Sequence, residues 1–84
     1  MSPGPSNSFK YPPMPLSMVE SGKNVRLVSL QAGRGLAQRL AEMGFIPGVE
    51  IHVVNNGITG PVVVLVKGSR LVLGRGMAYK ILVE

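Results

Sequence analysis

The segment Arg39–Gly48 (RLAEMGFIPG) constrains the fold most, because it specifies both the end of a helix and the start of a strand. Around it, Leu36, Leu40 and Met43 are spaced at i, i+4 and i+7, so they share one face of an α-helix. Polar side chains occupy the other side of the same helix. The spacing therefore predicts a helix over Arg34–Met43 whose apolar stripe packs on a core.

The end of this helix is specified by the glycines and the proline that follow. Gly44 stands where a left-handed residue usually closes a helix, and Phe45 comes next, as in a Schellman cap. Pro47 cannot continue a helix, and Pro47-Gly48 suits the centre of a tight turn. We therefore expect a helix-to-strand corner in which Leu40, Gly44, Pro47 and Gly48 have structural roles.

Most of the remaining sequence has the pattern of short strands separated by turns. The predicted strands are Asn24–Leu30, Val49–Asn55, Val62–Val66, Leu71–Leu73 and Tyr79–Val83. Asn55-Asn56-Gly57 is a strong turn signal. Val62–Val66 is apolar on both faces, which is typical of a strand that is central or covered on both sides. We expect a mainly β fold, a small β-barrel of about five strands with one α-helix between strands 1 and 2.

Composition narrows the class of protein further. Residues 1–13 hold four of the seven prolines and predict a disordered Pro/Ser/Gly-rich tail, with the domain over residues 14–84. The absence of Cys excludes disulfides and a Cys nucleophile. No apolar run reaches the roughly 18 residues of a membrane helix, so we expect a cytoplasmic protein that is not itself embedded in a membrane. The net charge of +5 is scattered along the chain, so no nucleic acid is expected as a partner.

The sequence offers little to catalysis or to metal binding. It contains one His, four Glu and no Asp, so a Ser-His-Asp triad is excluded. His52 and Glu50 share a strand face at i and i+2, but they supply two metal ligands at best, whereas a site needs three or four. We therefore predict no catalytic residue, no metal site beyond this weak pair and no cofactor. The chain is not expected to be an enzyme.

Binding surfaces remain as the source of function. Arg39 lies on the polar side of the predicted helix, Arg70 in a hairpin turn, and Arg75 between two glycines on a loop predicted to be mobile. Arginine is common where proteins contact each other, so these three residues are candidate contacts for an acidic partner.

The order and spacing of these features resemble the FeoA family over residues 15–84. The residues that carry the resemblance are Leu40, Gly44, Phe45, Pro47 and Gly48, then Gly60 and Pro61 before the valine strand, then Ala78, Ile81 and Val83 at the close. The resemblance implies an SH3-like barrel and an accessory role in ferrous iron uptake. It implies as the partner the cytosolic portion of a FeoB-type membrane transporter that bears a GTP-binding domain, and it leaves open whether the protein docks to that domain or promotes assembly.

A second function remains open at this point. Related SH3-like domains occur in iron-dependent repressors, so the alternative is a repressor-type accessory module with nucleic-acid binding. That alternative predicts an affinity for nucleic acid that falls steeply with salt.

Overall fold

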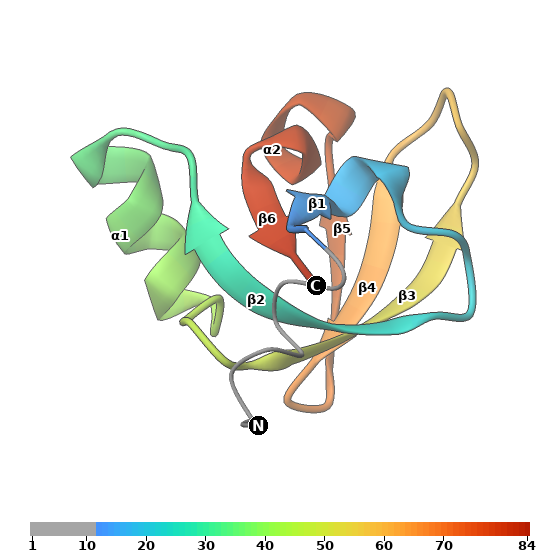
Figure 1. The fold of residues 1–84 in the computed structure, drawn as a ribbon, viewed down its shortest axis with the longest axis horizontal. Coiled ribbons are helices and arrows are strands. Elements are labelled where there is room, and N and C mark those ends of the chain that lie inside the picture. The colour runs from blue at the N-terminus through green and yellow to red at the C-terminus, as the bar shows by residue number, and fades with distance from the viewer. Residues whose placement is uncertain (1–11) are drawn as a thin grey trace, which may run out of the picture.

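The computed structural model describes residues 12–84, which form one sheet with two α-helices and a 3-10 turn (Figure 1). The elements in chain order are β1 (Met14–Pro15), the 3-10 turn η2 (Leu16–Met18), β2 (Asn24–Leu30), α1 (Arg34–Glu42), β3 (Glu50–Asn56), β4 (Val62–Val66), β5 (Ser69–Leu73), α2 (Arg75–Tyr79) and β6 (Ile81–Val83). No helix of this part of the chain is both long and apolar enough to cross a membrane.

The six strands are all antiparallel and pair in the order β1-β6-β2-β3-β4-β5. The prediction of a mainly β fold is confirmed, but the prediction of a closed barrel of about five strands is wrong, because β1 and β5 do not pair within residues 12–84. β1 has two residues, and its Pro15 has no amide hydrogen, so β1 offers too little backbone to bridge to β5. The sheet therefore stays open at both ends.

The helix placement also differs from the prediction. Met14 and Pro15 pair with Val83 and Leu82, which adds a first strand that the sequence pattern did not reveal. As a result α1 lies between the second and third of the six strands, and a second helix, α2, precedes β6. Tyr79, predicted to open the last strand, ends α2 instead, because the Ala78 amide donates to the Gly74 carbonyl at 2.9 Å and closes a helical turn.

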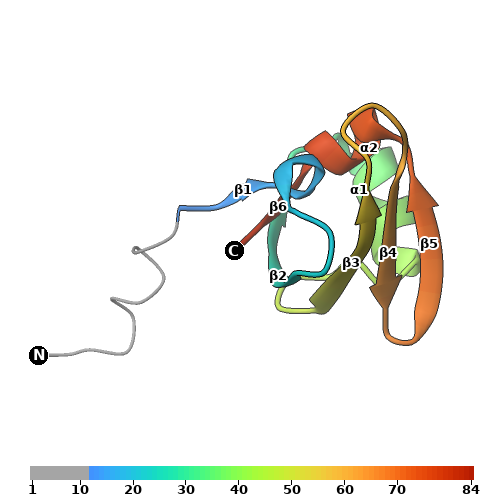
Figure 2. The same cartoon turned by 90° about the vertical axis from the view of Figure 1, so that its right-hand side faces the viewer.

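β2 joins the two halves of the sheet. Its first residues, Asn24–Arg26, pair with β3, whereas its last residues, Leu27–Leu30, pair with β6. The register shifts between Leu27 and Ser29, which marks a bulge, and bulges bend strands. The sheet thus curves around its core, with β3, β4 and β5 adjacent on one side (Figure 2).

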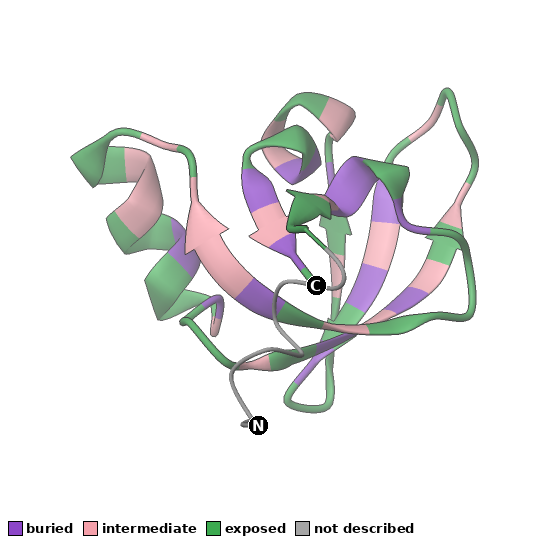
Figure 3. Ribbon diagram, in the orientation of Figure 1, coloured by how far each residue is buried: buried purple, intermediate pink, exposed green. Residues whose placement is uncertain are grey.

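The core lies on the concave side and is built almost entirely from aliphatic residues (Figure 3). It contains Leu16, Val19, Leu27, Leu40, Phe45, Ile51, Val53, Val62, Val64, Val66, Leu73, Ala78, Ile81 and Val83. Leu40 and Phe45 are fully buried, and Leu36 packs against this cluster. Met43, predicted to belong to the apolar stripe, is 42% exposed because α1 ends at Glu42 and the chain turns away there.

The helix-to-strand corner has the predicted geometry. Phe45 donates its amide to the Leu40 carbonyl at 2.9 Å and Gly44 donates to Ala41 at 3.0 Å, the two bonds of a Schellman cap. Gly44 has φ +105° and Gly48 has φ +90°, values that glycine tolerates best. The Val49 amide closes the Pro47-Gly48 turn on the Ile46 carbonyl at 3.0 Å. This geometry places the Phe45 side chain in the core.

The predicted turn at Asn55-Asn56-Gly57 is displaced. Asn55 and Asn56 belong to β3, and the chain reverses after Gly57. Asn56 stays in the strand because its side-chain amide donates to the carbonyls of Ser17 at 2.9 Å and Val19 at 2.7 Å. These long-range bonds outweigh the local preference of asparagine for turns.

Candidate protein interaction surface

The convex side of β3, β4 and β5 is the candidate site. The strand register places Asn24, His52, Leu65 and Arg70 in one row across four strands, because each is directly opposite the next. Val63 and Val72 form a second pair beside this row, also directly opposite each other. We call these six residues the outer sheet face. Their neighbours Val62, Val64 and Val66 point to the core and are at most 1% exposed.

Three of the six residues of the outer sheet face are apolar, although no other element of residues 12–84 covers it. Leu65 is 37% exposed and Val72 is 64% exposed. The solvent side of an antiparallel sheet normally carries polar residues, which gives the usual alternation along each strand. Here β4 is central in the sheet, as its sequence predicted, yet it is apolar on its uncovered side as well. Contiguous exposed apolar surface of this kind marks contact sites for other molecules.

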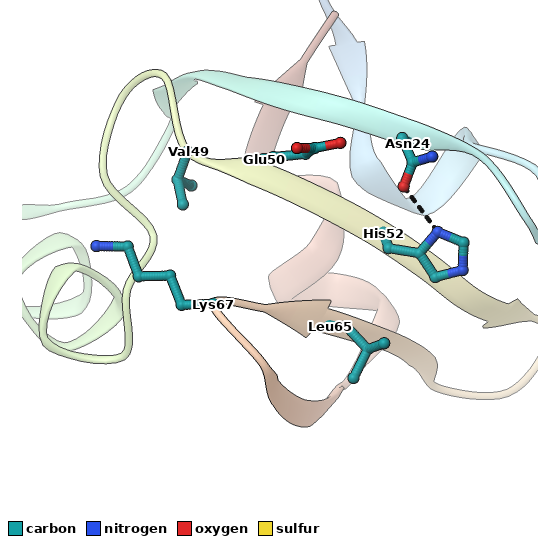
Figure 4. Close-up of a pocket in the computed structure, with 6 residues that line it drawn as sticks. All are labelled: Asn24, Val49, Glu50, His52, Leu65 and Lys67. Atoms are coloured by element: carbon teal, nitrogen blue, oxygen red, sulfur yellow. Dashed lines mark hydrogen bonds between the residues drawn. The ribbon is translucent and has the colours of Figure 1, made fainter.

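A shallow hollow lies at one end of this face and is lined by Asn24, Val49, Glu50, His52, Leu65 and Lys67 (Figure 4). Nδ1 of His52 is 2.8 Å from Oδ1 of Asn24 on the neighbouring strand, and the two side chains point toward each other. The asparagine oxygen accepts only, so this hydrogen bond requires the proton on Nδ1. The sequence pattern did not single out Asn24, since only the strand register brings it to His52.

The structure assembles no metal centre in the part of the chain that it describes. No group of three or more His, Cys, Asp or Glu side chains lies close enough together to hold an ion among residues 12–84. His52 and Glu50 do share a strand face and line the same hollow, as expected from their spacing. They remain a weak candidate pair, and the Nδ1 nitrogen of His52 is already engaged by Asn24.

The three candidate arginines lie apart. Arg70 was predicted to lie in a hairpin turn, but the turn is Lys67-Gly68, and Arg70 is exposed on β5 within the outer sheet face. Arg39 is exposed in the last turn of α1, where a positive charge interacts favourably with the helix dipole. Figure 2 shows α1 behind β5, the strand that carries Arg70. Arg39 and Arg70 therefore cannot belong to one compact patch.

Arg75 has a different environment. It is the first residue of α2 and is half-buried, so the prediction of a mobile loop at this position is wrong. Its guanidinium donates to Asn56 Oδ1 at 2.8 Å, to the Gly60 carbonyl at 3.0 Å and to the Ser17 carbonyl at 2.6 Å. Arg75 and Asn56 thus tie η2, the β3–β4 loop and α2 together. We call this pair the polar clamp.

The remaining residues of the sequence motif have structural positions. Gly60 supplies one carbonyl of the polar clamp, Pro61 is exposed immediately before β4, and Ala78 is fully buried in α2. The role of Asn56 in the clamp was missed because asparagine before glycine indicates a turn. The signal that reveals it is the pairing of distant strands, which no local pattern contains.

Comparison with known proteins places this geometry in a family. Residues 14–84 match the model of the FeoA domain. A protein of Methanocaldococcus jannaschii, provisionally named Fe(2+) transport protein A, is 41% identical over 70 residues, which cover 83% of this chain and 84% of that protein.

Solved structures show the same fold. The crystal structure of an iron uptake regulatory protein, FeoA, has a TM-score of 0.81 at 32% identity and covers 87% of this chain and 97% of that one. Stenotrophomonas maltophilia FeoA complexed with zinc, described as a prokaryotic SH3 domain protein, has a TM-score of 0.75 at 29% identity, covering 84% and 89%. A manganese-dependent transcriptional repressor shares the fold alone, with a TM-score of 0.76 at 19% identity over 86% of this chain and 41% of that one. The fold is SH3-like, and the chain belongs to the FeoA family.

Proposed function

We propose that this protein is a non-enzymatic, cytosolic accessory protein of ferrous iron uptake that acts by binding the cytosolic GTP-binding portion of a FeoB-type membrane transporter. The observation that carries the proposal is the outer sheet face, an uncovered apolar surface with an exposed arginine beside it, in a chain of the FeoA family. Apolar contacts framed by a charged residue are the usual composition of a protein–protein contact.

The chemistry of the described residues supports binding rather than catalysis. The single His of the chain, His52, is hydrogen-bonded to Asn24, and the most deeply engaged cation, Arg75, donates to three oxygen atoms of the protein itself. The hydrogen bonds of these two side chains hold parts of the fold together. The hollow beside His52 is open and shallow, unlike the enclosed clefts that bury small substrates.

Among the predicted partner contacts, we assign the main role to Arg70. Its side chain lies in the same row as Leu65 and next to Val72, so it can pair with an acidic residue at the border of an apolar contact. Arg39 lies on α1, away from β5, and we assign it no part in this contact. Arg75 acts on binding only through the shape that the polar clamp maintains.

The test is a titration of the full chain with the cytosolic GTP-binding portion of the FeoB-type transporter from the same organism. It is run without nucleotide, with GDP and with a non-hydrolysable GTP analogue. We expect saturable binding in at least one state, weakened by Arg70→Glu and unchanged by Arg39→Glu. Absence of binding in all three states would contradict the proposal.

The repressor-type alternative is decided by the same protein preparation. The likeness to a repressor shows the fold and nothing of its activity. If the alternative held, the chain would bind duplex DNA at low salt with an affinity that falls steeply as salt is added. We expect no such binding, because the basic residues lie on separate elements rather than on one stripe.

A further inference from the structure

The two edges of the sheet differ in what they offer to another strand. β1 has two residues and contains Pro15, so it is a blunted edge of the kind that resists further pairing. β5 has five residues, contains no proline, and pairs with β4 in continuous register without a bulge. It lies at the open end of the sheet, with β4 on one side and no strand on the other within residues 12–84 (Figure 2).

The turn between β4 and β5 fixes which backbone groups face this open side. Lys67 and Gly68 form the turn with φ +51° and φ +80°, the signature of a two-residue type I′ hairpin. In such a hairpin the flanking residues, Val66 and Ser69, are a hydrogen-bonded pair, and the pairs then alternate along the ladder. Arg70 and Val72 are therefore in non-hydrogen-bonded pairs. Their amides and carbonyls point away from β4, toward solvent.

The charge at this edge determines which kind of strand would bind there most favourably. β5 carries one charged residue, Arg70, which is exposed, and β5 contains no acidic residue. Lys67 lies in the turn beside β5 and lines the hollow together with Glu50. A second copy of β5 would bring another Arg70 to the same edge, where the two like charges would repel. A strand with acidic residues would instead place a carboxylate beside Arg70, and pairs of opposite charge across strands are favourable.

We propose that β5 is the docking edge of this protein, and that an extended, acidic segment of a partner protein adds to the sheet as a strand beside it. The partner's backbone pairs with the amides and carbonyls of Arg70 and Val72. Its side chains on the convex side alternate between an acidic residue near Arg70 and an apolar residue near Val72. The proposal deepens the proposed function and rests on it for the identity of the partner.

The sharpest variant is Val72→Pro, with Val72→Thr as its matched control. Proline at this position removes an amide that points to solvent, and it removes no hydrogen bond to β4. Threonine keeps the amide and the branched shape. With the cytosolic transporter portion as the probe, we expect Val72→Pro to weaken binding about tenfold, the loss of one backbone hydrogen bond and the adjacent pairing. Val72→Thr loses only part of one apolar contact, so it should weaken binding by less than about threefold.

A second readout does not depend on whether the proline variant folds. Backbone amide hydrogen exchange is measured on the unaltered full chain with and without the probe. In the free chain the Arg70 and Val72 amides should exchange fast while that of Leu71, which is bonded to β4, exchanges slowly. Binding should slow Arg70 and Val72 about tenfold or more. A bound complex in which these two amides stay fast, or Val72→Pro binding at full affinity in a folded state, would overturn the proposal.

A synthetic probe separates failure of this inference from failure of the proposed function. The probe is an extended peptide with the repeat Glu-Thr-Val-Thr, so that one face of the strand carries Glu and Val in turn, and its twin has Lys in place of each Glu. If the transporter portion does not bind at all, the proposed function fails, yet protection of Arg70 and Val72 by the Glu peptide alone still supports an acid-selective edge. Equal protection by both peptides, no protection by either, or protection that rises with the concentration of the chain itself would overturn the inference, the last by showing that a second copy occupies the edge.

Discussion

The two sides of β4 carry nearly the same residues and have opposite environments. Val62, Val64 and Val66 face the core and are 0%, 0% and 1% exposed, whereas Val63 and Leu65 face outward and are only partly buried. Burial of apolar surface is the main source of stability, so the inner residues hold the fold together. The outer ones are equally apolar without contributing as much to stability. That contrast is the basis for the proposal that a partner binds the outer side.

The largest loss of stability should come from truncating a buried side chain of the core. Phe45 is the largest fully buried side chain, and Phe45→Ala should destabilise the protein by about 3–5 kcal/mol, because the cavity adds to the lost burial. Urea unfolding followed by circular dichroism measures the change. Met18→Ala, at a position 63% exposed, is the control and should stay within about 0.5 kcal/mol. A similar loss in both variants would contradict the distinction between buried and exposed apolar residues.

The second prediction compares Arg75, in the polar clamp, with Arg70, on the outer sheet face. Arg75→Ala removes a guanidinium with three hydrogen bonds and takes the donor from the Gly60 carbonyl and from Asn56 Oδ1, so we expect a loss of about 2 kcal/mol. Arg70→Ala, on the outer sheet face, should change the unfolding free energy by less than about 0.5 kcal/mol. Thermal melts of the two variants side by side test this. A larger loss of stability for Arg70→Ala than for Arg75→Ala would contradict the stabilising role assigned to the polar clamp.

The third prediction concerns the corner that closes the inner side. Gly44→Val combines φ +105° with a Cβ that would lie 3.3 Å from Cγ1 of Val66. The left-handed backbone alone costs a branched residue about 1–2 kcal/mol, so we expect at least that loss in guanidinium unfolding. Gly57→Ala is the control, since an added Cβ there meets nothing within 4 Å and φ is not in the left-handed region. Equal stability of the Val variant and the unaltered chain would contradict the Schellman geometry.

The smallest effect should come from the outer side itself. Val72 is 64% exposed, so Val72→Thr should leave the free energy of unfolding within about 0.5 kcal/mol of the unaltered chain. Differential scanning calorimetry resolves a change of that size as a shift of a few degrees at most. A loss of more than about 2 kcal/mol would show that Val72 belongs to the core and would remove the basis for a free docking edge.

Local signals in the sequence were sufficient for the corner. Its geometry follows from the backbone preferences of Gly44, Pro47 and Gly48 and from the hydrogen bond of the Phe45 amide to the Leu40 carbonyl. All of these residues lie within ten positions of one another. The helix was predicted from its apolar spacing, and the strands Asn24–Leu30 and Val62–Val66 from their β-rich or apolar composition, which are likewise local properties.

The open sheet and the candidate site depend on pairing between distant segments, and no local pattern contains it. β1 becomes a strand only because Val83 and Leu82 lie beside it, and Asn56 leaves the predicted turn because of η2. The row from Asn24 to Arg70 likewise exists only through the register of four strands. The sequence therefore indicated apolar strands and exposed arginines, but not which of them share a surface.

The position of β6 has a consequence for how the protein is made. β6, residues Ile81–Val83, lies between β1 and β2, so the first two strands of the chain meet only through the last one. During synthesis, β1 and β2 leave the ribosome long before their partner exists. The β2–β3–β4–β5 meander can form early, but the half of the core that contains Leu16 and Ile81 must wait until Val83 has emerged. Until β6 pairs with it, β2 presents an exposed edge on the side that β6 later covers, and an unpaired edge of this kind is a template for pairing with other chains.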